Sequence, residues 1–454
     1  MRIRSRAAAN FMNPAEWNLS PYQILTLGFA LTILVGAFLL MLPESSQEGK
    51  SLPFIDALFT ATSATCVTGL TVVDTGNYFS TFGKMVLILL VQIGGLGVMT
   101  LTTLFAVMMG RRIQLKDRLL VQESLNQLTM KGMVRLVFYV VKITFLIEFI
   151  GGTILAIRFV PQYGMEGLFY GYWHAVSGFC NAGFDIFGGT NFFQYAADPV
   201  VVLTISMLII LGGLGFAVMN DIWGQRTWSG LTAQSKIVIL TTLVLLVFGT
   251  AILFLLEKDN TGTIGGLGIG GKLLASWFES VTARTAGFAM FDNGLLTESS
   301  LLMLILLMFI GASPASTGGG IKTSTFAIIV ASIWSLIRGR EDVVLFSRTV
   351  SVDVILRALA IFFLAASVTF FAAAYLCLTE GIPVIKAGFE VVSAFATVGL
   401  STGITAELSS DGKFLLIVMM LMGRVGIITF AMAFARKRNN RRLCRHPEGK
   451  FVIG

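Results

Sequence analysis

The sequence is poor in the residues from which catalytic and metal sites are usually built. It contains two histidines and four cysteines among 454 residues. The cysteines are scattered at Cys66, Cys180, Cys377 and Cys444, and they form neither a CxxC pair nor a spacing typical of zinc ligands. Paired carboxylates, and a nucleophile with a neighbouring base, are also lacking. The sequence therefore predicts a protein that is not an enzyme and that has no covalent cofactor.

Charged residues are scarce as well. They make up 13% of the chain, whereas soluble domains usually carry about 25%. Hydrophobic residues make up 55% of the sequence and the mean hydropathy is +0.82. The apolar runs have about the 20-residue length of a spanning helix, while a β-barrel would show alternating segments of roughly 10 residues. The predicted fold class is an all-α integral membrane protein.

Eight transmembrane helices are predicted, at 21–42, 82–109, 134–157, 199–219, 236–256, 299–337 (broken), 356–378 and 414–435. Within each successive pair lies a shorter apolar stretch, at 53–64, 166–178, 272–283 and 384–395. A helix of about a dozen residues is too short to cross about 30 Å of hydrocarbon. We therefore expect these stretches to enter the membrane from one side and to return.

Basic residues cluster at both ends of the chain and in the segments that join one pair of helices to the next. An excess of Lys and Arg marks the cytoplasmic side. The termini, 1–19 and 437–454, are thus both predicted to be cytoplasmic, and the short stretches enter from outside. This bias accounts for the net charge of +8, so no nucleic-acid partner is expected. The basic C-terminal tail is suited to bind anionic membrane lipid.

The short stretches are copies of one another. They read FTATSATCVTGL (59–70), WHAVSGFCNAGF (173–184), WFESVTARTAGF (277–288) and FEVVSAFATVGL (389–400). Each has an aromatic residue ten positions before a glycine, and a second glycine follows in the next helix, at Gly94, Gly212, Gly311 and Gly423. Regular self-similarity indicates a repeat architecture. We predict four helix–pore-loop–helix repeats, at 20–110, 130–222, 235–338 and 354–436, in a pseudo-fourfold arrangement around one pore.

Non-helical backbone at membrane depth is tolerated only where it is buried in protein or lines a water-filled cavity. Four such turns around one axis would present rings of carbonyl oxygens, which can replace the hydration shell of potassium. Glycine reaches the positive φ that such turns need, although a glycine can also serve only close helix packing. The predicted ion-binding filter residues are Val67, Thr68, Gly69, Asn181, Ala182, Gly183, Thr285, Ala286, Gly287, Thr397, Val398 and Gly399.

The sixth predicted span is too long for one membrane crossing and has the glycine-rich sequence GASPASTGGG at 311–320. Proline and several glycines break a helix, so we expect an intramembrane gating loop below the filter; a kinked helix without a moving part is the alternative. The predicted gate residues are Gly311, Ser313, Pro314, Ser316, Gly318, Gly319, Gly320, Lys322 and Arg424.

Arg424 is a charge in the middle of the last span. Such residues are costly in lipid and are usually functional. We expect it to face the pore, to repel cations and to hold the loop shut through loop carbonyls, with snorkelling towards a surface as the alternative. Lys322 fits either a gate component or an anchor at a helix end.

These motifs are similar to those of a known family. TATSATCVTGL, NAGF, TARTAGF and ATVGL, together with VVDTG (72–76), LVQESLNQ (120–127), VPQYG (160–164) and the terminal HPEGKFVIG, resemble the Trk/Ktr/HKT superfamily of potassium transporters, and most of all the bacterial Ktr membrane subunit, over essentially the whole chain. The resemblance implies potassium as the transported ion and uptake that is often sodium-dependent. It further implies a homodimer in the bacterial plasma membrane, with a cytosolic ring of nucleotide-binding subunits that senses ATP or ADP. In this family a glycine at the filter position of the first repeat goes with potassium selectivity, and in this sequence all four filter positions are glycine.

Several residues keep open interpretations. Cys66 and Cys180 fit small packing residues behind the filter or thiols that would let soft metal ions block the pore. Asp74 and Asp185 fit an outer mouth that concentrates cations or ordinary loop charges. His174 fits a structural histidine or, as the alternative, a pH sensor. The sequence assigns no role to Lys142 or Glu148. A sodium or mixed transporter of the same superfamily, or a secondary transporter with alternating access, remains as the alternative function.

Overall fold

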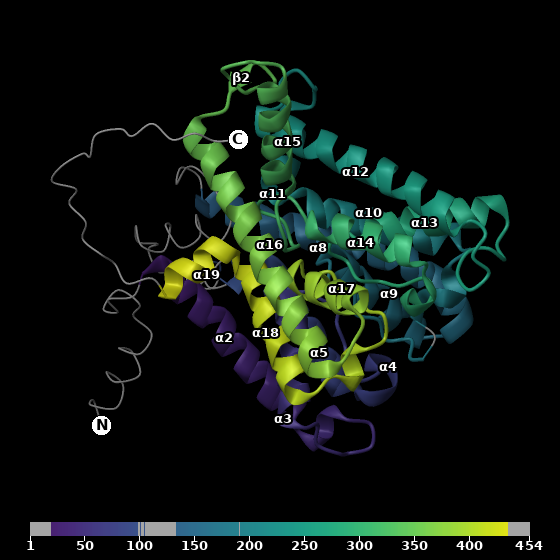
Figure 1. Cartoon of the computed structure of the whole chain (residues 1–454). Coiled ribbons are helices and arrows are strands. Elements are labelled where there is room, and N and C mark those ends of the chain that lie inside the picture. The colour runs from purple at the N-terminus through teal and green to yellow at the C-terminus, as the bar shows by residue number, and fades with distance from the viewer. Residues whose placement is uncertain (1–19, 99, 101–103, 105–132, 190, 435–454) are drawn as a thin grey trace, which may run out of the picture.

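The computed structural model describes residues 20–98, 100, 104, 133–189 and 191–434. The predicted cytoplasmic segments 1–19 and 437–454 lie outside the described residues, as does much of the C-terminal half of the predicted span 82–109. The described chain is almost entirely helical (Figure 1). One two-stranded antiparallel hairpin, β1 (Val344–Leu345) with β2 (Arg348–Thr349), joins the third and fourth repeats.

The same order of elements occurs four times: a long helix, a short helix, an irregular segment and a further helix. The long helices are α2 (Pro21–Leu40), α8 (Met133–Tyr163), α12 (Ala233–Glu257) and α16 (Val352–Glu380). The short helices are α3 (Phe54–Cys66), α9 (Glu166–Phe179), α13 (Ile269–Thr282) and α17 (Val384–Phe395). The closing helices are α5 (Thr81–Leu96), α10 (Pro199–Leu214) with α11 (Phe216–Gln225), α14 (Glu298–Phe309) with α15 (Thr323–Ile337), and α18 (Ser410–Val425) with α19 (Ile427–Phe434). Short helical turns lie between them, at α4 (Thr75–Tyr78), Pro43–Ser45, Asn191–Tyr195, Asn293–Leu295 and Thr405–Glu407.

Polar caps fix where the helices begin. Ser20 and Gln23 form a reciprocal capping box at the start of α2, with Pro21 in the first turn. Asp198 accepts hydrogen bonds from two backbone N–H groups of the first turn of α10, which begins with Pro199. Such caps satisfy N–H groups that have no partner inside the helix. The predicted helix starts are therefore largely encoded by local residues.

The long helix of each repeat is long and apolar enough to cross a membrane. Two bent pairs, α10 with α11 and α18 with α19, also qualify if each pair is one span. The described residues thus contain four to six candidate spans by length and composition. The predicted count of eight is not reached by this measure, because α14 and α15 are shorter apolar helices separated by a loop, and α5 runs into residues that are not described.

The closing helices are not straight, which differs from the spans predicted at 199–219 and 414–435. α10 and α11 meet at 94°, and α18 and α19 at 104°. The residues at the bends, Gly215 and Gly426, have φ values of 91° and 94°, and α5 ends at Gly97 with a φ of 83°. A helix cannot pass through such a conformation, which glycine adopts without steric cost. The signal was present in the sequence, since each bend glycine lies three residues after Gly94, Gly212 or Gly423.

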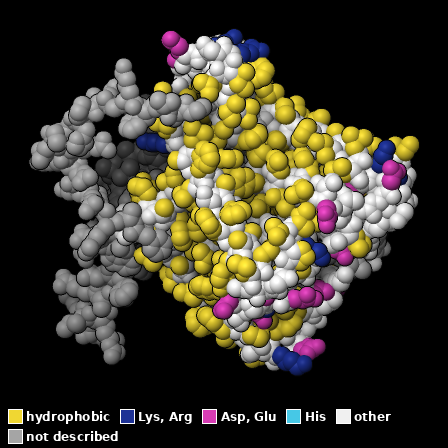
Figure 2. All heavy atoms as spheres, viewed as in Figure 1, with side chains coloured by type: hydrophobic (Ala, Val, Ile, Leu, Met, Phe, Trp, Pro, Cys, Tyr) yellow, Lys and Arg dark blue, Asp and Glu magenta, His cyan; other side chains and the backbone are white. Residues whose placement is uncertain are grey.

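The short helices form the centre of the molecule. Each packs against the closing helix of the preceding repeat in cyclic order: α3 against α18, α9 against α5, α13 against α10, and α17 against α14. Their side chains are largely buried, as Phe59, Phe278 and Phe389 show. By contrast, the long helices expose large apolar side chains such as Leu31 and Phe363. Figure 2 shows the resulting hydrophobic surface, with charged side chains mainly at its margins.

Candidate functional site

The four turns that follow the short helices meet in a closed ring. A Cβ added at Gly69 would collide with the carbonyl oxygen of Ala182, one at Gly183 with that of Ala286, one at Gly287 with that of Val398, and one at Gly399 with that of Thr68. Each glycine therefore lies directly against the backbone of the next repeat, and the fourth closes on the first. The turns predicted to form the filter are gathered about a common centre.

The backbone of the four turns has the same unusual conformation. The glycines Gly69, Gly183, Gly287 and Gly399 have φ values of 95°, 68°, 80° and 99°. The residues two positions earlier, Val67, Asn181, Thr285 and Thr397, also have positive φ, at 59°, 59°, 71° and 51°. Positive φ in a β-branched residue is a genuine outlier, and such strain clusters at functional sites. The sequence predicted positive φ for the glycines but gave no sign of it at the other four positions.

Hydrogen bonds draw the N–H groups of the turns back towards the short helices. The backbone N–H groups of Thr68, Ala182 and Val398 donate to the carbonyl oxygens of Ser63, Ser177 and Ser393, over 2.7, 2.8 and 2.8 Å. The Ala286 N–H donates to the Thr282 carbonyl oxygen over 2.9 Å. Among the hydrogen bonds of the described residues, none ends on a backbone carbonyl oxygen of the twelve predicted filter residues.

Two features around the ring favour cations and close packing. Each short helix ends immediately before its turn, so its partially negative C-terminal end lies at the ring. In addition, a Cβ at Gly94, Gly212 or Gly423 would collide with the carbonyl oxygen of Thr65, Phe179 or Phe395, the last turn of a short helix. Gly311, the corresponding glycine of the third repeat, instead lies against Gly319 and Gly320 of its own loop.

A cavity of about 470 Å³ opens above the ring, and all four filter glycines line it. Asp74, Asp185 and Asp292 also line it, whereas none of the lining residues in the described part of the chain is Lys or Arg. Asp74 is largely structural, because it caps α4 and accepts a hydrogen bond from the Gly189 N–H over 2.8 Å. Burial raises the pKa of the Asp185 carboxyl to about 7.

The segment Ile310–Lys322 between α14 and α15 is not helical, in keeping with the predicted loop rather than with a kinked helix. It folds back on itself, with Ile310 bridged to Ile321. Its tip inserts into the bend between α10 and α11: the Ser313 N–H donates to Gly213 over 3.0 Å, the Thr317 N–H donates to Gly212 over 3.2 Å, and the Phe216 N–H donates to Ala315 over 2.8 Å. The bend at Gly215 thus makes room for the loop.

The predicted gate residues differ in their placement within this loop. Ser313 is buried and its hydroxyl bonds that of Thr323, while Gly318 and Gly319 lie against the filter threonines Thr285 and Thr397. Ser316, Gly318, Gly320, Lys322 and Arg424 line a second cavity of about 680 Å³, which none of the four filter glycines lines. The carbonyl oxygen of Pro314 lies against Gly215.

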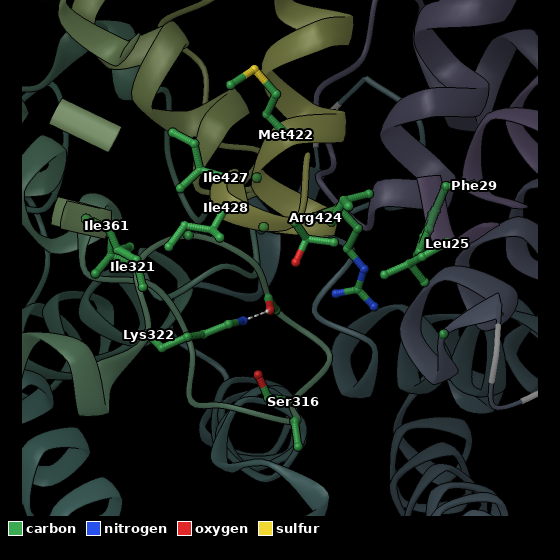
Figure 3. Close-up of a pocket in the computed structure, with 18 of the residues that line it drawn as sticks. Leu25, Phe29, Ser316, Ile321, Lys322, Ile361, Met422, Arg424, Ile427 and Ile428 are labelled. Carbon is green, nitrogen blue, oxygen red and sulfur yellow. Dashed lines mark hydrogen bonds between the residues drawn. The ribbon is translucent and has the colours of Figure 1, made fainter. Parts of the chain in front are cut away.

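Arg424 contacts the loop as expected. Its guanidinium donates to the carbonyl oxygens of Thr317 and Gly94, and also to that of Gly95 over 3.3 Å. The Lys322 ammonium donates to the Gly318 carbonyl oxygen over 2.8 Å, and Figure 3 shows both side chains directed towards this part of the loop. The contacts of Arg424 do not fit a side chain that snorkels to a surface. Both cations hold the loop through its backbone.

A family model described as "Cation transport protein", TrkH, matches residues 19–229 and 224–444. The chain belongs to this cation transport family. It is 44% identical to the "Ktr system potassium uptake protein B" of Bacillus subtilis, over 97% of this chain and 98% of that protein. It is 38% identical to the "Potassium/sodium uptake protein NtpJ" of Enterococcus hirae, over 96% and 98%. The predicted resemblance to the Trk/Ktr/HKT superfamily is therefore confirmed.

A solved structure shares the fold. The potassium transporter TrkH from Vibrio parahaemolyticus superposes with a TM-score of 0.72, at 17% identity, over 92% of this chain and 86% of that one. This chain is therefore a multi-pass membrane protein, because it is helical, contains apolar candidate spans and belongs to a family of membrane transporters.

One buried charge of this TrkH-family chain was missed by sequence reasoning. Arg284 immediately precedes the filter residue Thr285, at the position that Cys66, Cys180 and Ala396 occupy in the other repeats. Its guanidinium donates to the Thr242 carbonyl oxygen over 3.3 Å and to the Gly311 carbonyl oxygen, the start of the loop, over 3.5 Å. The signal was the R of TARTAGF, a charge in an apolar segment.

The cysteine behind the second filter turn lies in a small polar cluster. The Cys180 thiol is 3.7 Å from Gln92 and 3.8 Å from Glu148, and the Gln92 amide donates to Glu148 over 3.2 Å. A Cβ at Gly95 would collide with the sulfur, so Cys180 packs against α5 behind the turn. Both Cys66 and Cys180 are fully buried, which agrees with the packing interpretation. Among the described residues, no polar contact assigns a role to Lys142.

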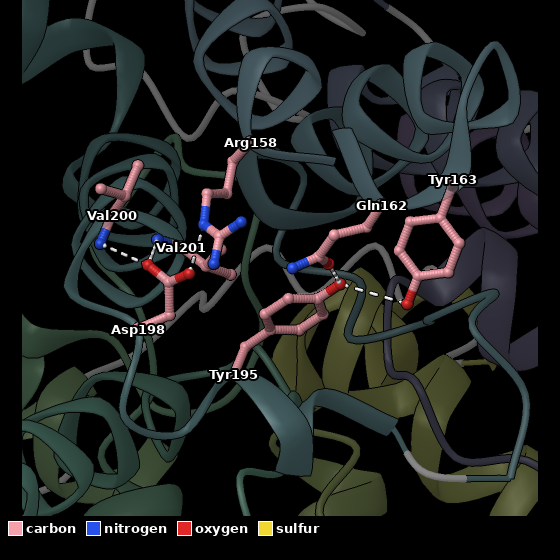
Figure 4. A network of polar contacts seen from close by, with 7 residues as sticks. All are labelled: Arg158, Gln162, Tyr163, Tyr195, Asp198, Val200 and Val201. Atoms are coloured by element: carbon pink, nitrogen blue, oxygen red, sulfur yellow. Dashed lines mark hydrogen bonds and ion pairs between the residues drawn. The ribbon is translucent and has the colours of Figure 1, made fainter. Parts of the chain in front are cut away.

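Two further sets of polar contacts lie in the second repeat. The buried His174 ring lies 3.4 Å from the Ile186 N–H, a donor just beyond the second filter turn, which agrees with a structural histidine. Farther out, Arg158 forms an ion pair with Asp198 over 2.6 Å, next to the Tyr195–Gln162 and Tyr195–Tyr163 hydrogen bonds (Figure 4). This network joins the C-terminal end of α8 to the N-terminal end of α10.

Proposed function

We propose that the protein takes up potassium through a channel-like pore whose selectivity filter is the ring of four turns. The observation that carries the proposal is the ring itself: four equivalent turns with positive φ at two positions each, and with backbone carbonyl oxygens that no donor of the described residues occupies. Carbonyl oxygens arranged in this way replace the water around potassium. Potassium at these carbonyls is the transported ion and not a resident cofactor.

In this proposal the chain has eight transmembrane helices in four pseudo-fourfold repeats. The cyclic packing of the short helices against the preceding closing helices supports one central axis. All four repeats have the same element order, which favours a ring over two halves that rock against each other. Alternating access is therefore the weaker alternative. The twelve predicted residues from Val67 to Gly399 supply the ion-binding carbonyls.

The loop Ile310–Lys322 is the proposed gate. It lies beneath the ring, and Arg424 and Lys322 hold it by hydrogen bonds to Thr317 and Gly318. Two cationic side chains below the filter also oppose the passage of a cation while the loop is in place. Opening requires the loop to leave the bend of α10 and α11. The negative-inside membrane potential drives uptake by about 2.3 kcal/mol per charge for each 100 mV.

The proposed assembly is a homodimer in the bacterial plasma membrane with both termini in the cytoplasm, controlled by a cytosolic ring that binds ATP or ADP. It is supported by the family resemblance and by relatives named as parts of a "Ktr system". Sodium is proposed as an activator. A mixed potassium and sodium transporter is a second candidate, because one relative of 38% identity is named a "Potassium/sodium uptake protein".

Replacing Gly69 by Ser tests the filter. The added side chain would meet the Ala182 carbonyl oxygen at a φ of 95°, so we expect uptake of rubidium, a potassium analogue, to fall sharply relative to that of sodium in potassium-requiring cells. Gly403→Ser is the matched control, because Gly403 has a φ of 92° but no atom near an added Cβ. If both variants keep the selectivity of the unchanged protein, the filter assignment is wrong.

A further inference from the structure

Thr317, in the middle of the loop, is bonded through every polar group that it has. Its N–H donates to the Gly212 carbonyl oxygen over 3.2 Å and its own carbonyl oxygen accepts from Arg424. Its hydroxyl lies 3.3 Å from the Phe179 carbonyl oxygen and 3.3 Å from the Asn181 side chain. The side chain is 1% exposed. One loop residue thus connects the closing helices of two repeats with the second filter turn.

The contact continues from Asn181 into the third filter turn. In one orientation of the Asn181 side-chain amide, both of its polar atoms have hydrogen-bond partners. The nitrogen donates to the carbonyl oxygens of Phe179 and Ile209 and to the Thr317 hydroxyl, and the oxygen accepts from the Thr285 hydroxyl over 3.2 Å. In the opposite amide orientation the 3.2 Å bond to Thr285 is also present. The chain Thr317–Asn181–Thr285 therefore does not depend on which way the amide is turned.

The neighbouring loop residues reach the fourth and third turns. The Gly319 N–H donates to the Thr397 hydroxyl over 3.0 Å. Gly318 lies so close to the Thr285 hydroxyl that no Cβ would fit. The loop segment 317–319 therefore touches three filter turns, and in each case the contact is with the residue of positive φ two positions before the filter glycine.

Backbone strain at Thr285 and Thr397 indicates that their side chains have a functional role. Glycine would take the positive φ of Thr285 and Thr397 without cost, whereas a threonine there is strained. Such strain persists when the surroundings fix it, typically at functional sites. The first repeat gives the contrast: its equivalent residue is the apolar Val67, which lies near Gly94 of α5, and the loop makes no hydrogen bond to it among the described residues.

We propose that the loop is latched to the filter through Asn181, Thr285 and Thr397, so that potassium binding in the filter and closure of the loop stabilise each other. The inference rests on the proposed function and adds a coupling between its two parts. When the loop leaves, the side chains of Asn181 and Thr397 each lose a hydrogen-bond partner and Thr285 loses its contact with Gly318, so the released filter holds potassium less tightly. Because coupling between two sites is reciprocal, potassium in the filter also favours the closed loop.

Thr317→Val tests the latch, because it removes the hydroxyl and keeps the shape and backbone contacts of Thr317. Loss of the hydroxyl, which contacts Phe179 and Asn181, should destabilise the latched loop by about 1 kcal/mol and so raise the open population, and with it the maximal rubidium influx, about fivefold. Both the KM for potassium and the maximal rate should rise. General destabilisation of the protein would lower the maximal rate instead. Thr317→Ser keeps the hydroxyl and is the matched control, and Thr397→Val tests the second contact independently.

Reciprocity is measured by labelling the loop. Ser316 lines the second cavity and is labelled in Figure 3, so Ser316→Cys, with Cys377 and Cys444 replaced by serine, reports loop exposure to a maleimide added to inside-out vesicles. Potassium inside the vesicles, at the outer mouth, should slow labelling about fivefold relative to sodium. Thr317→Val should abolish this difference, and Thr317→Ser should keep it.

The outcomes separate the two proposals. The latch is overturned if labelling is the same in potassium and in sodium, or if Thr317→Val leaves the KM and the labelling rate unchanged. In either case, selective rubidium uptake would still support the filter. Absence of rubidium uptake by the unchanged protein overturns the proposed function itself. Should Thr317→Val fail to fold, Thr397→Val and the potassium dependence of labelling in Ser316→Cys decide the question alone.

Discussion

Gly423 of α18 lies against the carbonyl oxygen of Phe395 so closely that a Cβ has no space. The contact joins the closing helix of the fourth repeat to the end of its short helix, directly behind the filter turn. We expect Gly423→Ala to displace this helix end and to lower rubidium uptake at least tenfold. Gly224→Ala is the control, because nothing lies within 4 Å of a Cβ there. Equal uptake by the two variants would contradict the role of close packing.

The seam between the fourth and first repeats contains a partly buried ion pair. The Lys413 ammonium of α18 lies 2.8 Å from the Asp56 carboxylate of α3, with side-chain exposures of 12% and 19%. Removing one partner leaves a poorly hydrated charge, so Lys413→Met and Asp56→Asn should each lower the melting temperature of the detergent-solubilised protein, while the double variant should recover part of the loss.

The exposed pair Lys50–Glu48 provides the control for this seam. Its side chains are 77% and 74% exposed, and exposed ion pairs contribute little to stability. Lys50→Met should leave the melting temperature unchanged. A shift as large as that of Lys413→Met would show that charge loss, and not the seam, is responsible.

Arg424→Ala should raise basal flux. The substitution removes the charge-assisted bond to the Thr317 carbonyl oxygen of the loop, worth about 1.5–3 kcal/mol, and a positive charge below the filter. Rubidium influx should increase roughly tenfold or more and should respond less to the cytosolic nucleotide. Arg348→Ala, on the exposed hairpin, is the control. Lower flux in Arg424→Ala, with normal protein in the membrane, would exclude a gate held by this residue.

Arg284 should stabilise the closed loop at its N-terminal end, through Gly311, whereas Arg424 bonds Thr317 in the middle of the loop. Arg284→Met keeps most of the side-chain volume but removes the donors to Thr242 and Gly311. We expect a folded protein with raised basal influx, smaller than that of Arg424→Ala because the bond to Gly311 is long. If Arg284→Met leaves influx unchanged and only lowers the melting temperature, the residue supports the helix end and not the loop.

Much of the architecture could be predicted from the sequence because repetition and polarity encode it. The short helices end within a few residues of their predicted ends, and the loop lies where proline and clustered glycines exclude a helix. The positive φ of Val67 and Thr397 could not be predicted, because no local preference of valine or threonine leads there; contacts between repeats impose it. The contact between Thr317 and Asn181 could not be predicted either, because the two residues are far apart in sequence and neither segment contains a pattern that indicates the other as its partner.

The beginning and end of the described chain lie together: α2 packs against α19, and the Gln23 amide donates to the Ala433 carbonyl oxygen over 3.1 Å. The first and last repeats also pack side by side. The order in which the repeats are covalently linked is therefore less important for the final structure than their order around the ring. A circularly permuted gene that begins with the second or third repeat, or two genes that each encode half of the molecule, should therefore yield the same assembled protein. Duplication of a smaller ancestral unit is the evolutionary history that such interchangeable parts suggest.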